Sequence, residues 1–428
     1  MRIVQKFGGT SVADIGRLEG VALKIKREVD AGNKVAVVVS AMAGVTNQLV
    51  TYTKAIAGAT LSDEYDAVAS TGEQITTALL ALALQQIGIP ARSFMGWQVP
   101  IITDKNHGNA SIQSVNPKAL LACWDEGIVP VISGFQGITR GKRITTLGRG
   151  GSDTTAVAIA AALEADRCDI YTDVDGVYTA DPRLVPLAQK LDQIGYGEML
   201  DLSGMGAKVL HAPCVEMAQR HGINVHVRSS FEDVSGTEII PQGTDSIPRI
   251  SGITHSPGWA RLNLFSHSPL VPQARFLSQL LAKSRVSVET IESYDVREVS
   301  YLSLLIPQAS LAFVMTMIDL NSKNKINKRA KFHFCEMILE NSLAKIGIIG
   351  LNLVSKKGFG DQLLKLINSD QLPLTLVSIA PQKFCLCAAE SLAPELVRTL
   401  HHQFGLDKKP HATTQYISSS QQIMATRS

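Results

Sequence analysis

The chain has 428 residues, of which 45 % are hydrophobic and 18 % are charged, with a formal net charge of +3. This length predicts two or three compact units, and a charge so close to balance argues against nucleic-acid binding. No stretch approaches the roughly 20 uninterrupted apolar residues of a membrane-spanning helix, so no membrane partner is expected.

The first residues run directly into a strand-like segment, without the basic, apolar and small-residue succession of a secretory signal. The six cysteines are scattered and lack the paired spacings of zinc sites and disulfide frameworks. These patterns predict a cytoplasmic protein whose cysteines are small buried residues and that has no metal site made by protein ligands alone.

Residues 1–230 alternate short β-branched runs with longer amphipathic segments, the pattern of a mainly parallel sheet covered by helices on both faces. Four short apolar runs that end in glycine or serine turns predict buried strands, at 3–7, 35–39, 128–132 and 169–172. Apolar residues at helical spacing predict a helix that stops before Gly32. This part therefore predicts an α/β catalytic domain.

The amino-acid composition changes at residues 231–248, which are rich in Gly, Ser, Asp and Pro and predict a linker. Beyond it, the segments 249–340 and 341–428 repeat one plan of strand, helix, two strands and helix. The repeat predicts two small ferredoxin-like βαββαβ units. A basic run over 323–331 predicts a solvated loop.

The first predicted strand brings Lys6, Gly8 and Gly9 to its carboxyl end, followed by Thr10 and Ser11. α/β sheets bind ligands at this edge. Glycines let backbone N–H groups approach anionic oxygens, and the lysine adds a full positive charge. The order differs from a P-loop, in which lysine follows the glycines and precedes Ser or Thr. We interpret the motif as a phosphate-binding turn.

A second glycine cluster, over 145–155, precedes an alanine-rich helix and contains Arg149. A guanidinium binds a carboxylate through two parallel hydrogen bonds, and the neighbouring glycines allow a small substrate to come close. Glu73 begins another predicted helix, where it either complements the helix dipole or pairs with a substrate ammonium group. Together, Arg149 and Glu73 would recognise the two ends of an amino acid.

The loop over 171–183 follows a predicted strand and combines acids, an aromatic residue and an arginine. Nucleotide recognition uses each of these types. Tyr178 could lie against a base, Arg183 could reach a phosphate, and the acids could hold ribose, water or magnesium.

Taken in order, these segments resemble the bacterial aspartate kinases, members of the amino-acid kinase family that carry two C-terminal ACT-type regulatory units. The resemblance covers essentially the whole chain. It depends on seven segments, at 6–11, 38–46, 70–74, 134–137, 145–155, 171–183 and 206–211.

The resemblance implies phosphorylation of the side-chain carboxylate of L-aspartate by ATP and Mg²⁺, which gives ADP and 4-phospho-L-aspartate at the start of a pathway of amino-acid biosynthesis. The catalytic residues that it implies are Lys6, Gly8, Gly9 and Lys208. The aspartate-binding residues are Ser40, Thr46, Glu73, Arg149, Ser152 and Asp153. The ATP-binding residues are Lys6, Gly9, Thr10, Ser11, Thr172, Asp173, Tyr178, Arg183 and Lys208.

The resemblance further implies a homodimer or larger assembly through the ACT-like units, and lysine or threonine as an inhibitor. The C-terminal region departs from the family pattern, because 267–271 reads His-Ser-Pro-Leu-Val where an Asp-x-Pro-Gly turn is expected. The second unit has Gly-Leu-Asn-Leu at 350–353 in place of a glycine-rich turn.

Two alternatives stay open. Another amino-acid kinase would act on acetylglutamate, carbamate, uridylate or a glutamyl carboxylate, but the pair of Glu73 and Arg149 suits a zwitterion better than these. A non-catalytic amino-acid sensor would bind ligand without turning over ATP.

Overall fold

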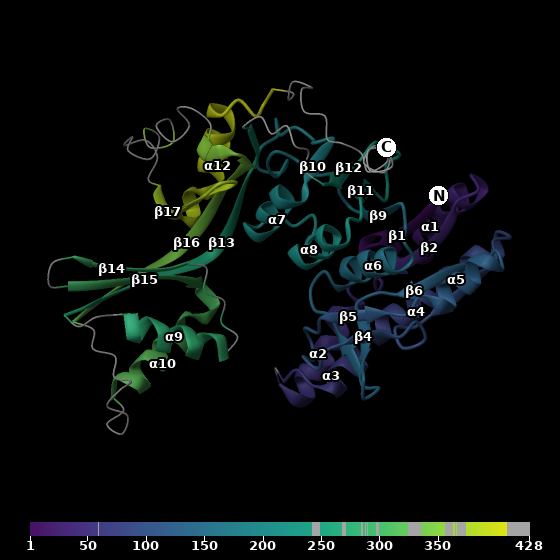
Figure 1. The fold of residues 1–428 in the computed structure, drawn as a ribbon, viewed down its shortest axis with the longest axis horizontal. Helices are drawn as coiled ribbons and strands as arrows, with labels where there is room; N and C mark the ends of the chain where they lie inside the picture. The colour runs from purple at the N-terminus through teal and green to yellow at the C-terminus, as the bar shows by residue number, and fades with distance from the viewer. Residues whose placement is uncertain are drawn as a thin grey trace, which may run out of the picture.

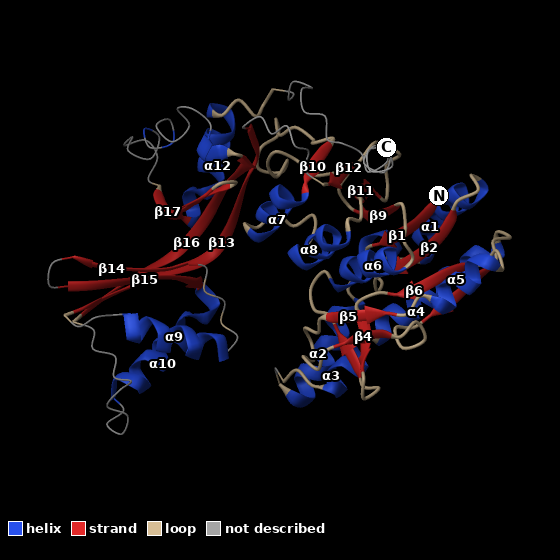
Figure 2. Cartoon of the chain, in the orientation of Figure 1, coloured by secondary structure: helices blue, strands red, loops and turns tan. Residues whose placement is uncertain are grey.

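The computed structural model describes residues 1–58, 60–241, 249–267, 271–283, 286, 288, 290–296, 299–323, 335–355, 363, 365 and 374–408. Within these residues, the chain forms an α/β domain with two sheets, followed by a region built on a third, antiparallel sheet (Figures 1 and 2).

The main sheet of the α/β domain has eight strands and is parallel except at one edge, where β12 runs antiparallel to β11 and β10 runs parallel to β12. In sheet order, the strands are β10 (Gln193–Gly195), β12 (Thr237–Ile240), β11 (Val225–Ser229), β9 (Arg167–Thr172), β1 (Arg2–Phe7), β2 (Lys34–Val39), β6 (Val129–Ser133) and β3 (Ala91–Phe94). The four predicted strands are confirmed as β1, β2, β6 and β9.

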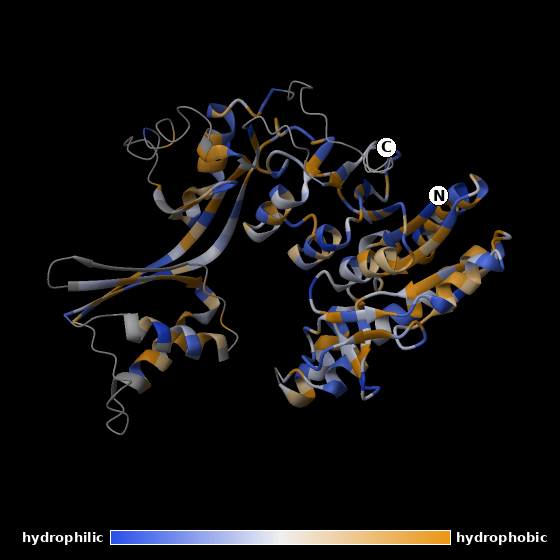
Figure 3. Ribbon diagram, in the orientation of Figure 1, coloured by the Kyte–Doolittle hydropathy of each residue, from blue (hydrophilic) through white to orange (hydrophobic). Residues whose placement is uncertain are grey.

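Helices cover both faces of this sheet, as the sequence predicts. One face carries α1 (Ile15–Asp30) and α4 (Thr71–Gln86). The other carries α5 (Lys118–Asp125), α6 (Gly151–Ala162), α7 (Tyr196–Gly204) and α8 (Ala212–His221). Apolar residues concentrate on the strands and on the helix faces that pack against them (Figure 3). Two separate cores thus hold the strands in place from opposite sides.

A smaller sheet lies beside the main one and carries part of the site. Its strands, in order, are β5 (Ile112–Val115), β4 (Ile101–Thr103), β7 (Gln136–Thr139) and β8 (Ile144–Thr146). Two helices belong to the same part of the domain, α2 (Val45–Ala57) and α3 (Asp63–Ala69). The stretch Asp63–Gln86 is long and apolar enough to cross a membrane, but it consists of α3 and α4, and α4 buries Leu80 and Leu84 in the core.

The third sheet has six antiparallel strands. In order, they are β14 (Thr290–Val296), β15 (Val299–Pro307), β13 (Arg249–Ser266), β16 (Glu336–Leu351), β18 (Lys383–Ala389) and β17 (Thr375–Ala380). Its helices are α9 (Val271–Lys283), α10 (Leu311–Lys323) and α12 (Ala393–Gln403). The predicted order of elements is confirmed for the first repeat. In the second, the helix expected between the first two strands, at 358–368, lies outside the described residues except at 363 and 365, and the basic run beyond Lys323 also lies outside them.

The two long strands of this sheet are shared between two four-stranded units. The first unit combines 259–266 of β13 with β15, β14 and 336–342 of β16, whereas the second combines 249–256 of β13 with 343–351 of β16, β18 and β17. The register shifts near Trp259, where β13 passes from one unit to the other.

The pairing differs in two ways from the boundaries predicted by the sequence. The chain-order division at 340/341 falls inside β16, and 249–256 lie in the sheet of the second unit because they pair with 345–351. The segment 231–248 is also more than a linker, since β12 lies inside it and buries Thr237, Ile239 and Ile240 in the main sheet. Its polar composition concealed a short strand of only four residues.

Candidate active site

The predicted motifs meet at the carboxyl edge of the main sheet. Backbone hydrogen bonds step across this edge from strand to strand: the N–H of Ser40 donates to the carbonyl of Phe7 (3.1 Å), and that of Gly8 donates to the carbonyl of Tyr171 (3.1 Å). The N–H of Gly134 likewise donates to the carbonyl of Val39 (3.0 Å). Turns from four strands are thereby held side by side, where α/β sheets bind their ligands.

Lys6 and Asp153 form a buried ion pair at the centre of this edge. The Nζ of Lys6 lies 2.6 Å from Oδ1 of Asp153, and each side chain is only 9 % exposed. Lys6 comes from β1 and Asp153 from the first turn of α6. The pair fixes the lysine ammonium beside the glycine turn and the amino end of a helix, which together favour anionic groups.

The glycine turn after β1 has no room for a side chain at Gly9 and leaves space beside Lys6 at Gly8. A Cβ on Gly9 would lie 2.8 Å from the carbonyl oxygen of Ala41, and a Cβ on Gly8 would lie 3.4 Å from Nζ of Lys6. The space beside the ammonium group is therefore kept open by the absence of a side chain at Gly8. Thr10 and Ser11 follow in a short 3₁₀ turn, and the Ser11 hydroxyl bonds to that of Ser230.

Glu73 places a buried carboxylate next to this turn. Its Oε1 accepts a hydrogen bond from the N–H of Ala41 (3.2 Å), whereas Oε2 is buried without a hydrogen-bond partner among the described residues. The residue is 3 % exposed, and burial raises the pKa of Glu73 to about 7. Leaving a buried acceptor unpaired is costly, so Oε2 is available to a donor from a ligand.

The second glycine cluster presents Arg149 at the surface. Gly148 and Gly150 have φ of 76° and 68°, a conformation that glycine adopts without strain. A Cβ on Gly150 would overlap the imidazole of His211, so the loop packs closely against the segment that follows Lys208. Arg149 itself is exposed, and its guanidinium has no hydrogen bond or ion pair within the part of the chain that the structure describes.

The other predicted substrate residues lie around this cluster. Ser152 and Asp153 are buried in the first turn of α6, and a Cβ on Gly134 would lie 2.7 Å from the Ser152 hydroxyl oxygen. Ser40 follows β2 and Thr46 lies in the first turn of α2, both half-buried. All six predicted substrate residues therefore come from segments at this edge.

Sequence reasoning missed Asp66, a fully buried carboxylate on α3. It accepts hydrogen bonds from Nδ1 of His107 (2.7 Å), from the N–H of Gly108 (3.0 Å) and from the Thr146 hydroxyl. Thr146 ends β8, two residues before Gly148. Asp66 thus ties three segments together at the base of the arginine loop; the acidic start of α3 was the only sequence signal.

The predicted nucleotide loop follows β9. The Thr172 carbonyl accepts from the N–H of Ser230 (2.9 Å), and the Thr172 hydroxyl donates to Asp173 (3.1 Å). The Tyr178 hydroxyl donates to Oδ1 of Asp175 (2.9 Å), and burial together with this bond raises the pKa of Tyr178 to about 12.

Two predicted phosphate contacts, Arg183 and Lys208, are exposed. Arg183 makes two bonds to Asp181, with Nε–Oδ1 at 3.0 Å and Nη2–Oδ2 at 2.7 Å, so its exposed guanidinium is paired with a carboxylate. The charges of Asp181 and Lys208 both act on His255: burial lowers the pKa of His255, Asp181 opposes this shift and Lys208 adds to it. Lys208 is thus near the end of the nucleotide loop that carries Asp181 and Arg183.

A glycine-lined sheet edge with a buried ammonium group and a helix amino terminus is suited to holding phosphate, and this places the protein in the class of small-molecule kinases. Residues 1–229 match the family model described as the amino acid kinase family.

Relatives match over nearly the whole chain. An aspartokinase of Geobacillus stearothermophilus is 37 % identical over 414 residues, which cover 96 % of this chain and 98 % of the relative. An aspartate kinase of Pseudomonas fluorescens is 39 % identical over 412 residues, covering 95 % and 98 %. The chain belongs to the amino acid kinase family and, within it, to the aspartokinases.

A solved aspartokinase structure has the same overall fold as this chain. The structure of E. coli aspartokinase III in complex with aspartate and ADP is 26 % identical and superposes with a TM-score of 0.77 over 94 % of this chain and 99 % of that one. The predicted family and fold class are thereby confirmed, while the roles of individual residues stay predictions.

Proposed function

We propose that this chain transfers the γ-phosphoryl group of ATP to the side-chain carboxylate of L-aspartate. The observation that carries the proposal is the buried Glu73, whose unpartnered Oε2 lies beside the glycine turn. A substrate ammonium group would supply the missing donor and the opposite charge. The E. coli aspartokinase III structure named above contains aspartate and ADP.

The reaction needs no general base, because a carboxylate is nucleophilic as it stands. A side-chain oxygen of aspartate would form a bond to the γ-phosphorus while the bond from that phosphorus to the bridging oxygen of ADP breaks. Positioning and neutralisation of charge should supply most of the catalysis. Lys6, Lys208 and the N–H group of Gly9 would stabilise the transferring oxygens, since the N–H of Gly8 already donates to the carbonyl of Tyr171.

The residues fit a nucleotide with magnesium. The open space at Gly8 lies beside the Lys6 ammonium group, and a Cβ there would fill it. No three His, Cys, Asp or Glu side chains gather into a metal-binding group among the described residues. Magnesium usually keeps several waters and binds through one or two carboxylates plus substrate phosphates. It would neutralise phosphate charge here, with Asp153 or Asp173 as its protein ligand.

We assign aspartate recognition to the predicted substrate residues. Glu73 would bind the ammonium group and Arg149 the α-carboxylate, while Ser40, Thr46 and Ser152 would complete the pocket. ATP would be held by Thr10 and Ser11 at the glycine turn, by Thr172, Asp173 and Tyr178 after β9, and by Arg183 and Lys208 at the phosphates.

The ACT-like region would provide assembly and regulation. Residues 336–342 of β16 pair with β13 along one edge, but no described strand pairs with the other edge, and Met337, Ile338 and Leu339 are about two-fifths exposed. An apolar strand edge of this kind pairs readily with another chain. We therefore propose a homodimer through this edge; light scattering that shows a single 46.1 kDa chain would contradict it. Both proposed substrates are cytosolic metabolites, which favours a cytoplasmic location.

Hydroxylamine trapping of the acyl phosphate tests the function. Purified protein with ATP and Mg²⁺ should give hydroxamate from aspartate, and none from glutamate, acetylglutamate or carbamate. Lysine and threonine belong in the same assay as inhibitors, since a second E. coli aspartokinase III structure, in the T-state, contains lysine. Folded protein that binds an amino acid without turning over ATP would favour the sensor instead.

A further inference from the structure

We propose that His401, on α12 of the second unit, is a positioning residue for the nucleotide loop and sets the affinity of the kinase for ATP. This inference depends on the proposed function, because it assigns ATP to the loop over 172–183. The imidazole acts through one intermediary, Thr179, which is the residue next to Tyr178.

Thr179 joins three parts of the molecule. It is 3 % exposed, and its hydroxyl oxygen lies 2.9 Å from Nε2 of His401. The same oxygen accepts the N–H of Gln189 (2.9 Å), and the Thr179 carbonyl accepts the N–H of Ile253 on β13 (2.7 Å). The nucleotide loop thus forms a hydrogen bond with the backbone of β13, in the half of that strand that belongs to the second unit.

The donor in the Thr179–His401 bond follows from these contacts. The hydroxyl oxygen accepts from Gln189, and Nε2 of His401 is the acceptor that the described contacts offer to the hydroxyl proton, so that proton is directed to Nε2. His401 is 1 % exposed, and burial lowers its pKa, so a neutral imidazole with Nε2 as acceptor is the form that fits. Loss of this acceptor would leave the Thr179 hydroxyl buried with an unused proton.

Apolar packing also joins the nucleotide loop to the second unit. Ala180 and Val185, each 5 % exposed, belong to the hydrophobic core of the second unit, together with Ile253, Leu396 and Leu400. Leu184 and Ala188 pack against this core as well. The segment that begins beside Tyr178 and contains the Asp181–Arg183 pair is therefore part of the core of the second unit, and that unit completes the nucleotide site.

Two other contacts between the α/β domain and the second unit leave this loop untouched. Lys383 on β18 lies 3.4 Å from Asp201 on α7, and Glu198 on α7 bonds to Ser251 on β13. Both contacts involve α7, which supports neither Tyr178 nor Arg183 directly. Lys383→Ala therefore weakens attachment of the second unit without reaching the loop, and serves as the matched control.

The experiment compares His401→Leu, His401→Gln, Thr179→Val and the Thr179→Val/His401→Leu double variant in the full chain. KM for ATP and for aspartate is measured by hydroxamate formation, and Kd for ADP by calorimetry. His401→Leu should raise the KM for ATP and the Kd for ADP about five- to tenfold, the effect of one buried hydrogen bond. The KM for aspartate should stay within about twofold.

Two comparisons distinguish positioning from general destabilisation. His401→Gln retains an acceptor and should recover most of the ADP affinity, and the double variant should be no weaker than Thr179→Val alone because both remove one bond. Unchanged ADP affinity in folded His401→Leu, or an equal rise in the KM for aspartate or in the Lys383→Ala control, would overturn the inference. Calorimetry with ADP decides it even if the wild type does not phosphorylate aspartate.

Discussion

Replacement of Arg149 by alanine is expected to lower kcat/KM for aspartate about 100- to 1000-fold, the effect of losing a bidentate bond between a guanidinium and a carboxylate. The side chain is exposed and has no partner among the described residues, so its removal breaks no contact of the fold that the structure records. The Kd for ADP should be unchanged, because the nucleotide loop lies on a different segment. Steady-state kinetics and calorimetry measure the two effects separately.

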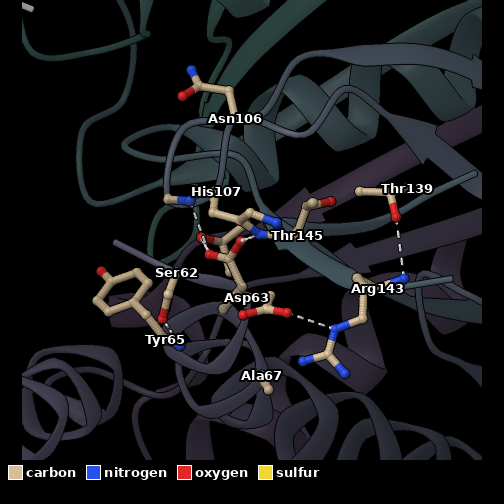
Figure 4. Close-up of polar contacts among 12 residues, drawn as sticks. Ser62, Asp63, Tyr65, Ala67, Asn106, His107, Thr139, Arg143 and Thr145 are labelled. Atoms are coloured by element: carbon tan, nitrogen blue, oxygen red, sulfur yellow. Dashed lines mark hydrogen bonds and ion pairs between the residues drawn. The ribbon is translucent and has the colours of Figure 1, made fainter. Parts of the chain in front are cut away.

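Arg143 gives a matched control, because it precedes β8 and Arg149 follows the same strand. It is also exposed, but its guanidinium pairs with Asp63 (2.9 Å) and Glu64 (Figure 4). Arg143→Ala should retain near-wild-type activity, whereas Arg149→Lys should recover only part of the loss because it keeps the charge without the planar fork. An Arg149→Ala enzyme with unchanged kcat/KM would remove this residue from the site.

Replacement of Glu73 by glutamine is expected to remove most activity with aspartate. The amide has the shape of the carboxylate but no negative charge, so a substrate ammonium group would lose its counter-charge inside a buried site. In the wild type, kcat/KM for aspartate should fall as pH drops below about 7, because protonation of free Glu73 has the same effect. A pH profile that is flat from 6 to 8 would contradict this role.

The same substitution should stabilise the protein at alkaline pH. The pKa of Glu73 in the folded state, about 7, lies above the ordinary value of 4.5, so ionisation is less favourable in the folded state than in the unfolded state. Compared with Glu73→Gln, the wild type therefore keeps its full free energy of unfolding below pH about 4.5 and loses part of it as pH rises through about 7. At pH 8 without substrates, Glu73→Gln should gain about 3 kcal/mol of unfolding free energy.

Urea unfolding at pH 5 and pH 8 measures this gain, which should be much smaller at pH 5. Glu19→Gln is the control, because Glu19 is an exposed carboxylate on α1 of the same domain. Equal stability of Glu73→Gln and wild type at pH 8 would show that the buried carboxylate is compensated in the folded protein.

The sequence predicted those features that are determined locally. Strands such as β1 and β2 are recognisable because both of their faces are buried and their residues are continuously apolar. The glycine turn at Gly8 and Gly9 and the cluster around Arg149 are recognisable because close backbone approach needs glycine at fixed positions. These motifs specified the chemistry of the site before its geometry was visible.

Features that depend on distant partners were not predictable in the same way. The register between β13 and β16 joins residues about a hundred positions apart, and nothing local indicates that one strand serves two units. Asp66 and Thr179 are ordinary polar residues whose roles come from His107 and His401. His401 follows Thr179 by 222 positions in the sequence. Such contacts become visible only after the fold is assembled.

The way in which the two units share β13 and β16 also orders the events of protein synthesis. The ribosome makes residues 249–256 before the whole first unit, but their partners at 345–351 emerge only after it. Until β18 and α12 are also made, Ala180 and Val185 have no core to enter. A nascent chain can therefore fold its main sheet early and yet acquires its finished nucleotide loop only near the end of translation.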